Sequence, residues 1–235
     1  MIDFKKIKKN NLTFFIAEIG HNHQGSVKKA KEIIKVAKEA GATAVKFQKR
    51  DNKSLFTEAL YNQIYDNKNS YANTYGEHRE YLEFSKTQFR ELISYSKSLD
   101  IMLFATPFDF KSVDILESLK IPAYKIASAD LINTPLQIKI AKLKKPIFLS
   151  TGGGKIADIT RAVKTITKFN RNLCIMHCTA SYPAEISDLN LNVIKTLKKK
   201  YPDFLIGLSD HENGIDAGPL AYMLGARVFE KHFTL

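Results

Sequence analysis

Two histidines have the spacing that most directly suggests chemistry in this sequence. His211 ends the string GLSDH and His232 lies in EKHF, so they are 21 residues apart, the same separation as Ser209 and Glu230. Equal separations are typical of equivalent positions on two consecutive strand–helix units. Because adjacent strands lie about 4.8 Å apart, two such imidazoles can share one divalent metal ion, with water or substrate oxygens as further ligands. The alternative is a pair of hydrogen-bonded or surface histidines.

Polar side chains also follow most of the other apolar runs. They comprise carboxylates, lysines, hydroxyls and an amide, namely Glu18, Lys46, Gln48, Lys125, Ser128, Asp130, Ser150, Tyr182, Ser209 and Glu230. Lysines and hydroxyls can hold a phosphate or a carboxylate, and the glycines of TGGG (151–154) add backbone N–H groups before a helix. The two glutamates supply acid–base capacity. Together these groups predict a site for an anionic substrate.

The alternation of side chains between the two faces of a strand sorts these candidates. Lys46 and Gln48 share one face of their strand, and Phe47 takes the other. If Phe47 packs against helices, Lys46 and Gln48 point into the mouth of a barrel. In the same way Glu230 and His232 share a face.

Eight short apolar runs alternate with segments of helical periodicity along the chain. We predict strands at 13–19, 44–48, 101–106, 123–127, 146–151, 173–179, 204–209 and 226–232. We predict helices at about 26–40, 86–99, 109–119, 133–143, 156–169, 190–200 and 214–224. This alternation indicates a parallel sheet, which most economically closes into a (β/α)8 TIM-type barrel. An open doubly wound sheet is the alternative, but its GxGxxG signature does not follow the first strand.

Two features break the repeating pattern. The eighth predicted strand ends near Leu235 without a helix to cover it, so we expect a barrel truncated after strand eight, a fragment of a longer protein.

The connection 49–85 is far longer than a usual βα loop of about 2–6 residues. It is either a lid over the substrate or a surface helical excursion. It holds five of the ten tyrosines: Tyr61, Tyr65, Tyr71, Tyr75 and Tyr81.

Composition indicates an ordinary globular protein. The 235 residues are 44% hydrophobic and 26% charged, without a long apolar run or a secretory leader, so we expect a cytoplasmic location and no membrane partner. Cys174 and Cys178 have neither CxxC nor disulfide-framework spacing and are expected to be free core thiols. The net charge of +12 permits a nucleic-acid partner. We predict none, because the lysines lie mostly on polar helix faces and no nucleic-acid-binding motif accompanies them.

Through almost its whole length the chain resembles the sialic acid synthase family, the phosphoenolpyruvate-dependent nonulosonate synthases. Eight strings occur in order: FIAEIGHNHQGS, AVKFQ, ATPFD, YKIASAD, STGGG, HCTASYP, GLSDH and EKHF. The resemblance implies a single (β/α)8 barrel domain over residues 1–235. It also implies a reaction of phosphoenolpyruvate with N-acetylmannosamine or a related N-acyl amino sugar, which gives a nonulosonic acid and phosphate. The implied cofactor is Mn²⁺ or Mg²⁺, and the full-length form is expected to be a homodimer.

The resemblance also implies roles for the motif residues. His211 and His232 would bind the metal, and Glu18 would be the general acid or base. Glu230 is expected to be a second catalytic residue, near the sugar. Asp130, in YKIASAD, is expected to bind substrate. The implied contacts to phosphoenolpyruvate come from Lys46, Lys125, Ser128, Ser150 and Ser209, with Gln48 and Tyr182 near the sugar.

Three departures from the family pattern stand out. Ala180 occupies a place where members usually carry a polar residue that touches phosphoenolpyruvate, so either that contact is lost or the subfamily differs. His21 stands where a small or apolar residue is more common and could alter the choice of sugar. The family's C-terminal antifreeze-like domain, which reaches the partner's active site in the dimer, does not follow the barrel in this sequence.

Two other functions remain open. A truncated barrel could bind metal and phosphoenolpyruvate without turnover. Another phosphoenolpyruvate-condensing synthase could use a phosphorylated aldose, which would require a second anion site. The sequence offers no further Lys/Arg cluster at the predicted strand ends to provide one.

Overall fold

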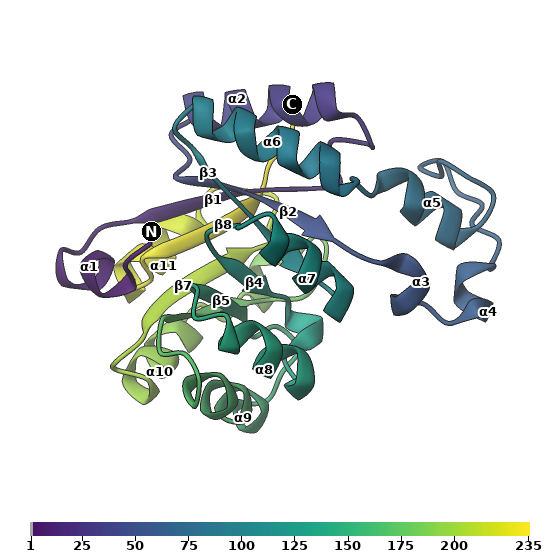
Figure 1. The fold of residues 1–235 in the computed structure, drawn as a ribbon. Helices are drawn as coiled ribbons and strands as arrows, with labels where there is room; N and C mark the ends of the chain where they lie inside the picture. The colour runs from purple at the N-terminus through teal and green to yellow at the C-terminus, as the bar shows by residue number, and fades with distance from the viewer. Residues whose placement is uncertain (1) are drawn as a thin grey trace.

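Eight parallel strands form a closed ring in the computed structural model, which describes residues 2–235. They are β1 (Phe14–Gly20), β2 (Ala44–Lys49), β3 (Met102–Pro107), β4 (Tyr124–Ile126), β5 (Ile147–Ser150), β6 (Leu173–Cys178), β7 (Leu205–Asp210) and β8 (Val228–His232). They pair in chain order, and β8 closes the ring against β1 with Glu18 opposite His232 (Figure 1). The predicted (β/α)8 barrel is confirmed, and the open sheet is wrong.

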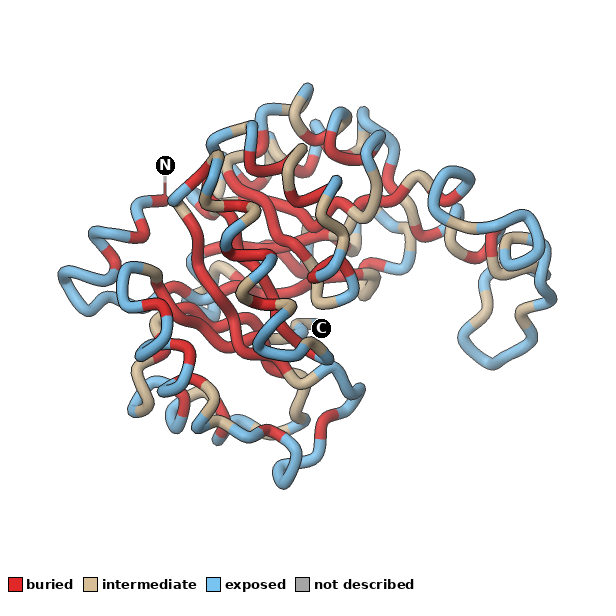
Figure 2. The backbone as a smooth tube through the Cα atoms, turned by 90° about the horizontal axis from the view of Figure 1, so that it is seen from below, coloured by how far each residue is buried: buried red, intermediate tan, exposed pale blue. Residues whose placement is uncertain are grey.

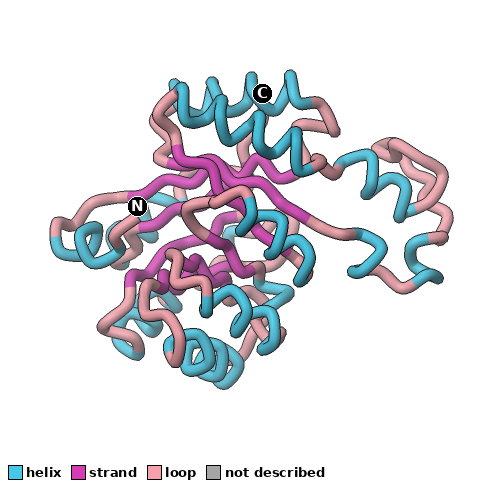
Figure 3. Tube along the Cα trace, viewed as in Figure 1, coloured by secondary structure: helices cyan, strands magenta, loops and turns pink. Residues whose placement is uncertain are grey.

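Helices surround the ring on its outside (Figure 3). Those that follow the predicted pattern are α2 (Val27–Glu39), α6 (Lys86–Ser98), α7 (Phe110–Ser118), α8 (Thr134–Lys142), α9 (Ile156–Thr167), α10 (Val193–Lys200) and α11 (Ala217–Leu224). In α2, the Ser26 side chain accepts a hydrogen bond from the Lys29 backbone N–H, which caps the first turn. Ile33, Ile34 and Ala37 then recur on one face and are buried against the sheet.

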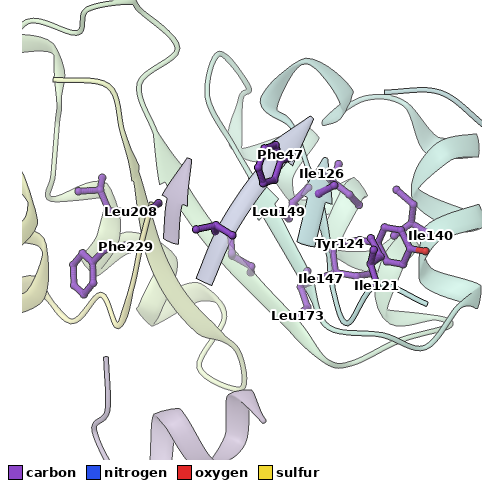
Figure 4. Packing of buried hydrophobic residues seen from close by; sticks show 14 of the residues in the cluster. Phe47, Ile121, Tyr124, Ile126, Ile140, Ile147, Leu149, Leu173, Leu208 and Phe229 are labelled. Carbon is purple, nitrogen blue, oxygen red and sulfur yellow. The ribbon is translucent and has the colours of Figure 1, made fainter. Parts of the chain in front are cut away.

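Alternation along the strands separates two apolar layers. Outward-facing side chains pack against helices, and the Phe47 ring lies 6.1 Å from that of Phe89 on α6. Figure 4 shows other members of this layer, including Tyr124 and Ile140. Inward-facing side chains form a second cluster that includes Phe148. Figure 2 shows that burial is concentrated on the strands and the inner faces of the helices.

A short helix that the sequence analysis did not predict closes one end of the barrel. This helix is α1 (Phe4–Lys9), and the ring of Phe4 packs edge-on against that of Phe148 with 5.1 Å between ring centres. Phe148 also lies 5.8 Å from Phe14 and 5.1 Å from Phe104. These rings fill the amino-terminal end of the barrel. The opposite end, where the strands finish, holds a cavity.

The long connection after β2 projects from the barrel (Figure 1). We call residues 50–85 the arm; it contains α3 (Asn52–Leu55), α4 (Glu58–Tyr61) and α5 (Tyr75–Leu82). Its aromatic rings pack on one another, with Tyr65 5.3 Å from Tyr75 and Tyr71 stacked 4.7 Å from Tyr81. The structure therefore favours the interpretation as a helical excursion over that of a lid.

An apolar groove borders β1 and β8 on the outside of the barrel. Phe15 of β1 and Phe229 of β8 stack there, 5.3 Å apart. They line this groove together with Ile215, Tyr222 and Met223.

The cysteine prediction is confirmed, since Cys174 and Cys178 are both buried and free. None of the helices described over residues 2–235 has the length and apolar character needed to cross a membrane.

The ring cluster at the amino-terminal end predicts a large stability difference between two phenylalanine substitutions. Phe148→Ala should lower the free energy of unfolding by about 3–5 kcal/mol, because it removes the ring that three others contact. Phe110→Ala, at a side chain that is 47% exposed, should cost less than about 1 kcal/mol. Urea denaturation followed by circular dichroism measures both. Similar losses in the two variants would contradict this account of the core.

Candidate active site

A cavity of about 420 Å³ opens at the carboxyl ends of the strands. It collects side chains from strands and loops around the whole ring. The sequence-predicted residues that line it are Glu18, Lys46, Gln48, Lys125, Ser128, Ser150, Tyr182, Ser209, His211, Glu230 and His232. Strand alternation is the reason, because every second residue of a barrel strand faces inward.

Two buried ion pairs occupy the centre of the cavity. Lys46 Nζ lies 2.6 Å from Glu18 Oε2 and donates to Thr106 Oγ1 at 3.0 Å. Lys125 Nζ donates to Glu230 Oε1 at 2.9 Å. Isolated charges would be too costly at this depth, so each requires its partner. The result is a compact set of charges on the barrel axis.

These charges support one another. Burial by itself would raise the pKa of Glu230, but the positive charges of Lys125 and Lys46 outweigh it and lower this pKa to about 2. Burial would lower the pKa of Lys46, while the charges of Glu18 and Glu230 raise it. At neutral pH Glu230 is therefore a carboxylate and Lys46 an ammonium group.

Some polar atoms in the cavity have no protein partner within the described residues. Ser150 Oγ and Glu230 Oε2 are buried without a hydrogen bond. Buried polar atoms are nearly always satisfied in folded proteins. These two atoms are therefore available to a ligand.

The TGGG loop is held close to the same place. The Gly152 backbone N–H donates to Ser128 Oγ at 3.0 Å. A Cβ on Gly152 would lie 2.9 Å from that oxygen and 3.0 Å from the Ala180 Cβ, so no larger residue fits without displacing them. The glycine thus permits the loop after β5 to approach the β4 end of the cavity.

The two histidines lie side by side at the ends of β7 and β8. Their ring centres are 5.6 Å apart, and the Tyr182 ring lies 4.0 Å from that of His211. His211 Nδ1 bonds to the Thr179 carbonyl at 2.8 Å, which leaves Nε2 free. Burial lowers the pKa of His232, which favours its neutral form.

This pair fits a divalent metal ion that completes its coordination elsewhere. The His211 bond to a carbonyl is the kind of contact that orients a metal-binding imidazole. Over residues 2–235 no group of three or more His, Cys, Asp or Glu side chains is arranged to hold a metal. Two protein ligands would leave the other positions to water or substrate oxygens.

Asp130 is the one predicted site residue that does not line the cavity. It ends the 3₁₀ turn η1 (Ser128–Asp130) after β4, and its carboxylate accepts a hydrogen bond from Asn133 Nδ2 at 2.9 Å. In such a turn, residues two apart point in different directions. Ser128 therefore faces the cavity while Asp130 supports the start of α8.

Sequence reasoning missed several lining residues, above all Arg50 and Arg79. Arg50 follows Lys46 and Gln48 at the same two-residue spacing, so alternation beyond the predicted end of the strand could have identified it. Arg79 lies on α5 in the arm, and no spacing rule connects it with the strand ends. Thr106 and Cys178 also line the cavity.

The loop after β1 is fixed by a buried histidine. The His23 ring stacks on Phe84 with 4.1 Å between ring centres, and its Nδ1 accepts a hydrogen bond from the Gly25 backbone N–H at 3.1 Å. Burial lowers the pKa of His23 to about 3. The ring therefore stays neutral and holds the loop that carries His21 to the cavity.

The closed barrel, with a charged cavity at its carboxyl end and two histidines beside it, defines a (β/α)8 protein whose candidate active site lies at the strand ends. The NeuB family model matches residues 33–235, and the chain belongs to the NeuB family. The resemblance to the sialic acid synthases is thereby confirmed.

Similar proteins extend beyond the region that this chain matches. The chain is 41% identical over 223 residues to the N-acetylneuraminate-9-phosphate synthase of Drosophila melanogaster, a match of 94% of this chain and 60% of that protein. It is 38% identical to the N,N'-diacetyllegionaminic acid synthase of Campylobacter jejuni. That match covers 95% of this chain and 68% of that protein. The chain thus spans about three fifths of the length of the Drosophila protein.

A solved structure agrees with these matches. The N-acetylneuraminic acid (sialic acid) synthetase from Leptospira borgpetersenii serovar Hardjo-bovis, in complex with citrate, superposes with a TM-score of 0.85. Its sequence is 36% identical, and the match covers 96% of this chain and 74% of that one.

The shifted pKa of His23 predicts a pH-dependent stability. An unfolded histidine titrates near pH 6.5, so below that pH the unfolded chain binds a proton that folded His23 does not. Stability is then lost as the pH falls, and this residue contributes a loss of about 2 kcal/mol between pH 7 and pH 5. His23→Gln should be less stable at pH 8 but should lose about 2 kcal/mol less over that range. Urea titrations at several pH values test this, and parallel pH profiles for the two proteins would contradict it.

Proposed function

We propose that this protein condenses phosphoenolpyruvate with an N-acyl amino sugar, such as N-acetylmannosamine, to give a nonulosonic acid and phosphate. The observation that carries the proposal is the cavity at the strand ends, where lysine–glutamate pairs, serine hydroxyls and two histidines converge in a NeuB-family chain. The names of the relatives include both sialic and legionaminic acids, and one product carries a phosphate. The proposal therefore fixes the substrate class and leaves several sugars as candidates.

Phosphoenolpyruvate would bind among the positive and hydroxyl groups of the cavity. Lys46 and Lys125 supply charge, and Ser128, Ser150 and Ser209 supply hydroxyls. The unpartnered Ser150 Oγ is the clearest free donor. Fixed donors of this kind stabilise a phosphate that gains negative charge as it leaves.

His211 and His232 would hold Mn²⁺ or Mg²⁺, which when bound supplies a positive charge to polarise the sugar carbonyl. Two protein ligands leave room for that carbonyl oxygen to approach. Tyr182 borders both rings and would position the sugar beside them.

Glu18 would act as the general acid and base. Its Oε1 accepts from Gln48 Nε2 at 2.8 Å and its Oε2 lies 2.6 Å from Lys46 Nζ, so the carboxylate is fixed at the cavity wall. When C3 of phosphoenolpyruvate bonds to the sugar carbonyl carbon, the carbonyl oxygen must gain a proton. The water that adds at C2 must lose one before the C–O bond to phosphate breaks. One group that takes and returns a proton serves both steps.

The proposal extends to location and assembly. The buried free thiols Cys174 and Cys178 fit a reducing compartment, which supports a cytoplasmic enzyme. The resemblance to the sialic acid synthases supports a homodimer of the full-length form. Two competing functions are separated by the first assay. One is a truncated barrel that binds metal and phosphoenolpyruvate without turnover, and the other is a phosphoenolpyruvate-condensing synthase that uses a phosphorylated aldose.

The first assay measures phosphate released from phosphoenolpyruvate by the natural gene product with Mn²⁺ and a panel of N-acyl amino sugars and aldose phosphates. We expect release that depends on an amino sugar and falls about 100-fold or more in Glu18→Gln, because a positioned acid–base group contributes at least that much. Glu39→Gln, on the solvent side of α2, is the matched control and should be fully active. Sugar-independent release, or an active Glu18→Gln variant, would refute the proposed role.

A second prediction concerns Ser150. Ser150→Ala should weaken phosphoenolpyruvate binding about tenfold, because it removes one hydrogen bond to a charged group. It should not lower the free energy of unfolding, because the hydroxyl has no partner in the protein. Calorimetric titration and urea denaturation measure the two effects, with Ser94→Ala on the exposed face of α6 as control. Unchanged affinity would remove Ser150 from the phosphoenolpyruvate site.

A further inference from the structure

The amino-terminal end of the barrel carries the surplus of positive charge. Four segments lie there: residues 2–13 before β1, and the last turns of α8, α9 and α10 with the loops that follow, 139–146, 164–172 and 197–204. We call these four segments the basic end. They hold 14 lysines or arginines and two acidic residues, so their net charge of +12 equals that of the whole chain. The remaining residues carry 22 charges of each sign.

The helix dipole does not account for this accumulation. Basic residues are common at the carboxyl ends of helices because they offset the dipole, and that effect acts on every helix of the barrel. The equivalent segments after α2, α6 and α7 are nevertheless balanced: 36–43, 95–101 and 115–123 each hold one basic and one acidic residue. The surplus is therefore confined to one sector of the amino-terminal end.

Contacts join the four segments into one surface. The Lys8 side chain of α1 donates to the Pro202 carbonyl in the loop after α10. In turn Asp203 of that loop pairs with Arg171 of the loop after α9, at 3.1 Å. The Asn170 side chain donates to a backbone carbonyl of the loop after α8, at 2.6 Å. The surface lies on the side of the barrel where α1 is drawn, opposite the arm (Figure 1).

Most of these charges have no acidic partner. Lys139 and Lys145 pair with Asp114 and Glu117 of α7, at 2.7 and 2.5 Å. Among residues 2–235, no carboxylate oxygen lies within 4.0 Å of the side-chain nitrogens of eleven others, all of them exposed lysines. A partner that complements this surface must present many negative charges over a wide area.

The side chains among the lysines favour an anionic membrane over a nucleic acid. Lys142 Nζ lies 5.5 Å from the centre of the Phe169 ring, and the Arg171 guanidinium carbon lies 5.5 Å from that of Phe204. Cations thus cover the two rings on which a base would stack. Thirteen of the 14 basic residues are lysines, which lack the planar fork that reads base edges. Leu12 is 47% exposed and would enter a headgroup layer.

We propose that the basic end docks on a membrane surface rich in anionic phospholipids. Lysines are attracted by the negative potential of such a surface over about one Debye length, roughly 10 Å. The candidate active site lies at the other end of the strands, so its mouth stays open to substrate when the protein is docked. The inference is independent of the proposed function.

The expectation of no membrane partner rested on apolar runs. The lysines of the basic end come from four segments that are distant in sequence, and each segment by itself resembles a solvated helix end. Only the closed barrel brings them together. The proposed contact is peripheral and electrostatic, so it requires no membrane-spanning helix.

The test measures co-sedimentation of the natural gene product with vesicles made of equal parts of phosphatidylglycerol and phosphatidylcholine, at about 0.1 M NaCl. We expect binding to these vesicles and none to vesicles of phosphatidylcholine alone. Raising the salt to about 0.5 M should release the protein, because the Debye length becomes shorter.

Two double variants locate the contact. Lys168→Gln/Lys199→Gln removes two exposed lysines of the basic end, and Lys28→Gln/Lys86→Gln removes two exposed lysines elsewhere. Both lower the net charge of +12 by two. The first should weaken vesicle binding roughly 25-fold, since each lysine near the surface contributes about fivefold, and the second less than about threefold. Thermal unfolding checks that both variants are folded.

Several outcomes would overturn the proposal. Equal losses in the two variants would mean that the attraction is spread over the whole molecule. Equal binding to both kinds of vesicle, or binding to neither, would exclude an electrostatic membrane contact. Tighter binding of a DNA duplex than of the anionic vesicles at the same phosphate concentration, lost in Lys168→Gln/Lys199→Gln, would identify the basic end as a nucleic-acid surface instead.

Discussion

The burial of ionised lysines and glutamates inside a closed barrel is the constraint on which this site depends. Water cannot stabilise Lys46, Glu18, Lys125 and Glu230 at that depth, so each charge must be met by another at hydrogen-bond distance. The ring of strands supplies the rigid frame that keeps those distances. An anionic ligand that enters the cavity would replace some of the contacts between lysines and glutamates with contacts to itself. These contacts are strong because the effective dielectric constant inside the barrel is lower than that of water.

The two ends of the same strands carry different kinds of side chain, apolar ones that stabilise the fold and polar ones that line the cavity. At the amino-terminal end, inward positions carry Phe14, Phe104 and Phe148, and at the carboxyl end the inward positions carry charges and hydroxyls. Outward positions of most strands bury apolar side chains under the helices, and the groove beside β1 and β8 is the exception. The alternation of side chains along the same strands therefore produces an apolar cluster at the amino-terminal end, a polar cavity at the carboxyl end and an apolar outer surface that packs against helices.

Most of this arrangement could be predicted from the sequence, because alternation and strand order are local properties. The strand ends placed Lys46, Ser209 and the histidines correctly around one cavity. Asp130 could not be placed, because the irregular turn after β4 breaks the alternation. α1 is too short to show a periodic pattern, and the position of Arg79 depends on how the arm folds.

The arm has a consequence for how such a protein can change over generations. Its tyrosine rings pack largely on one another, while Phe84 at its end packs in the barrel core, and the arm carries Arg79 to the cavity wall. Substitutions among these tyrosines and at Arg79 can therefore change this wall of the cavity at small cost to the barrel. The charged centre, where each group depends on its neighbour, has no such freedom. Sequence change in this architecture should thus accumulate in the arm while the charged centre stays constant.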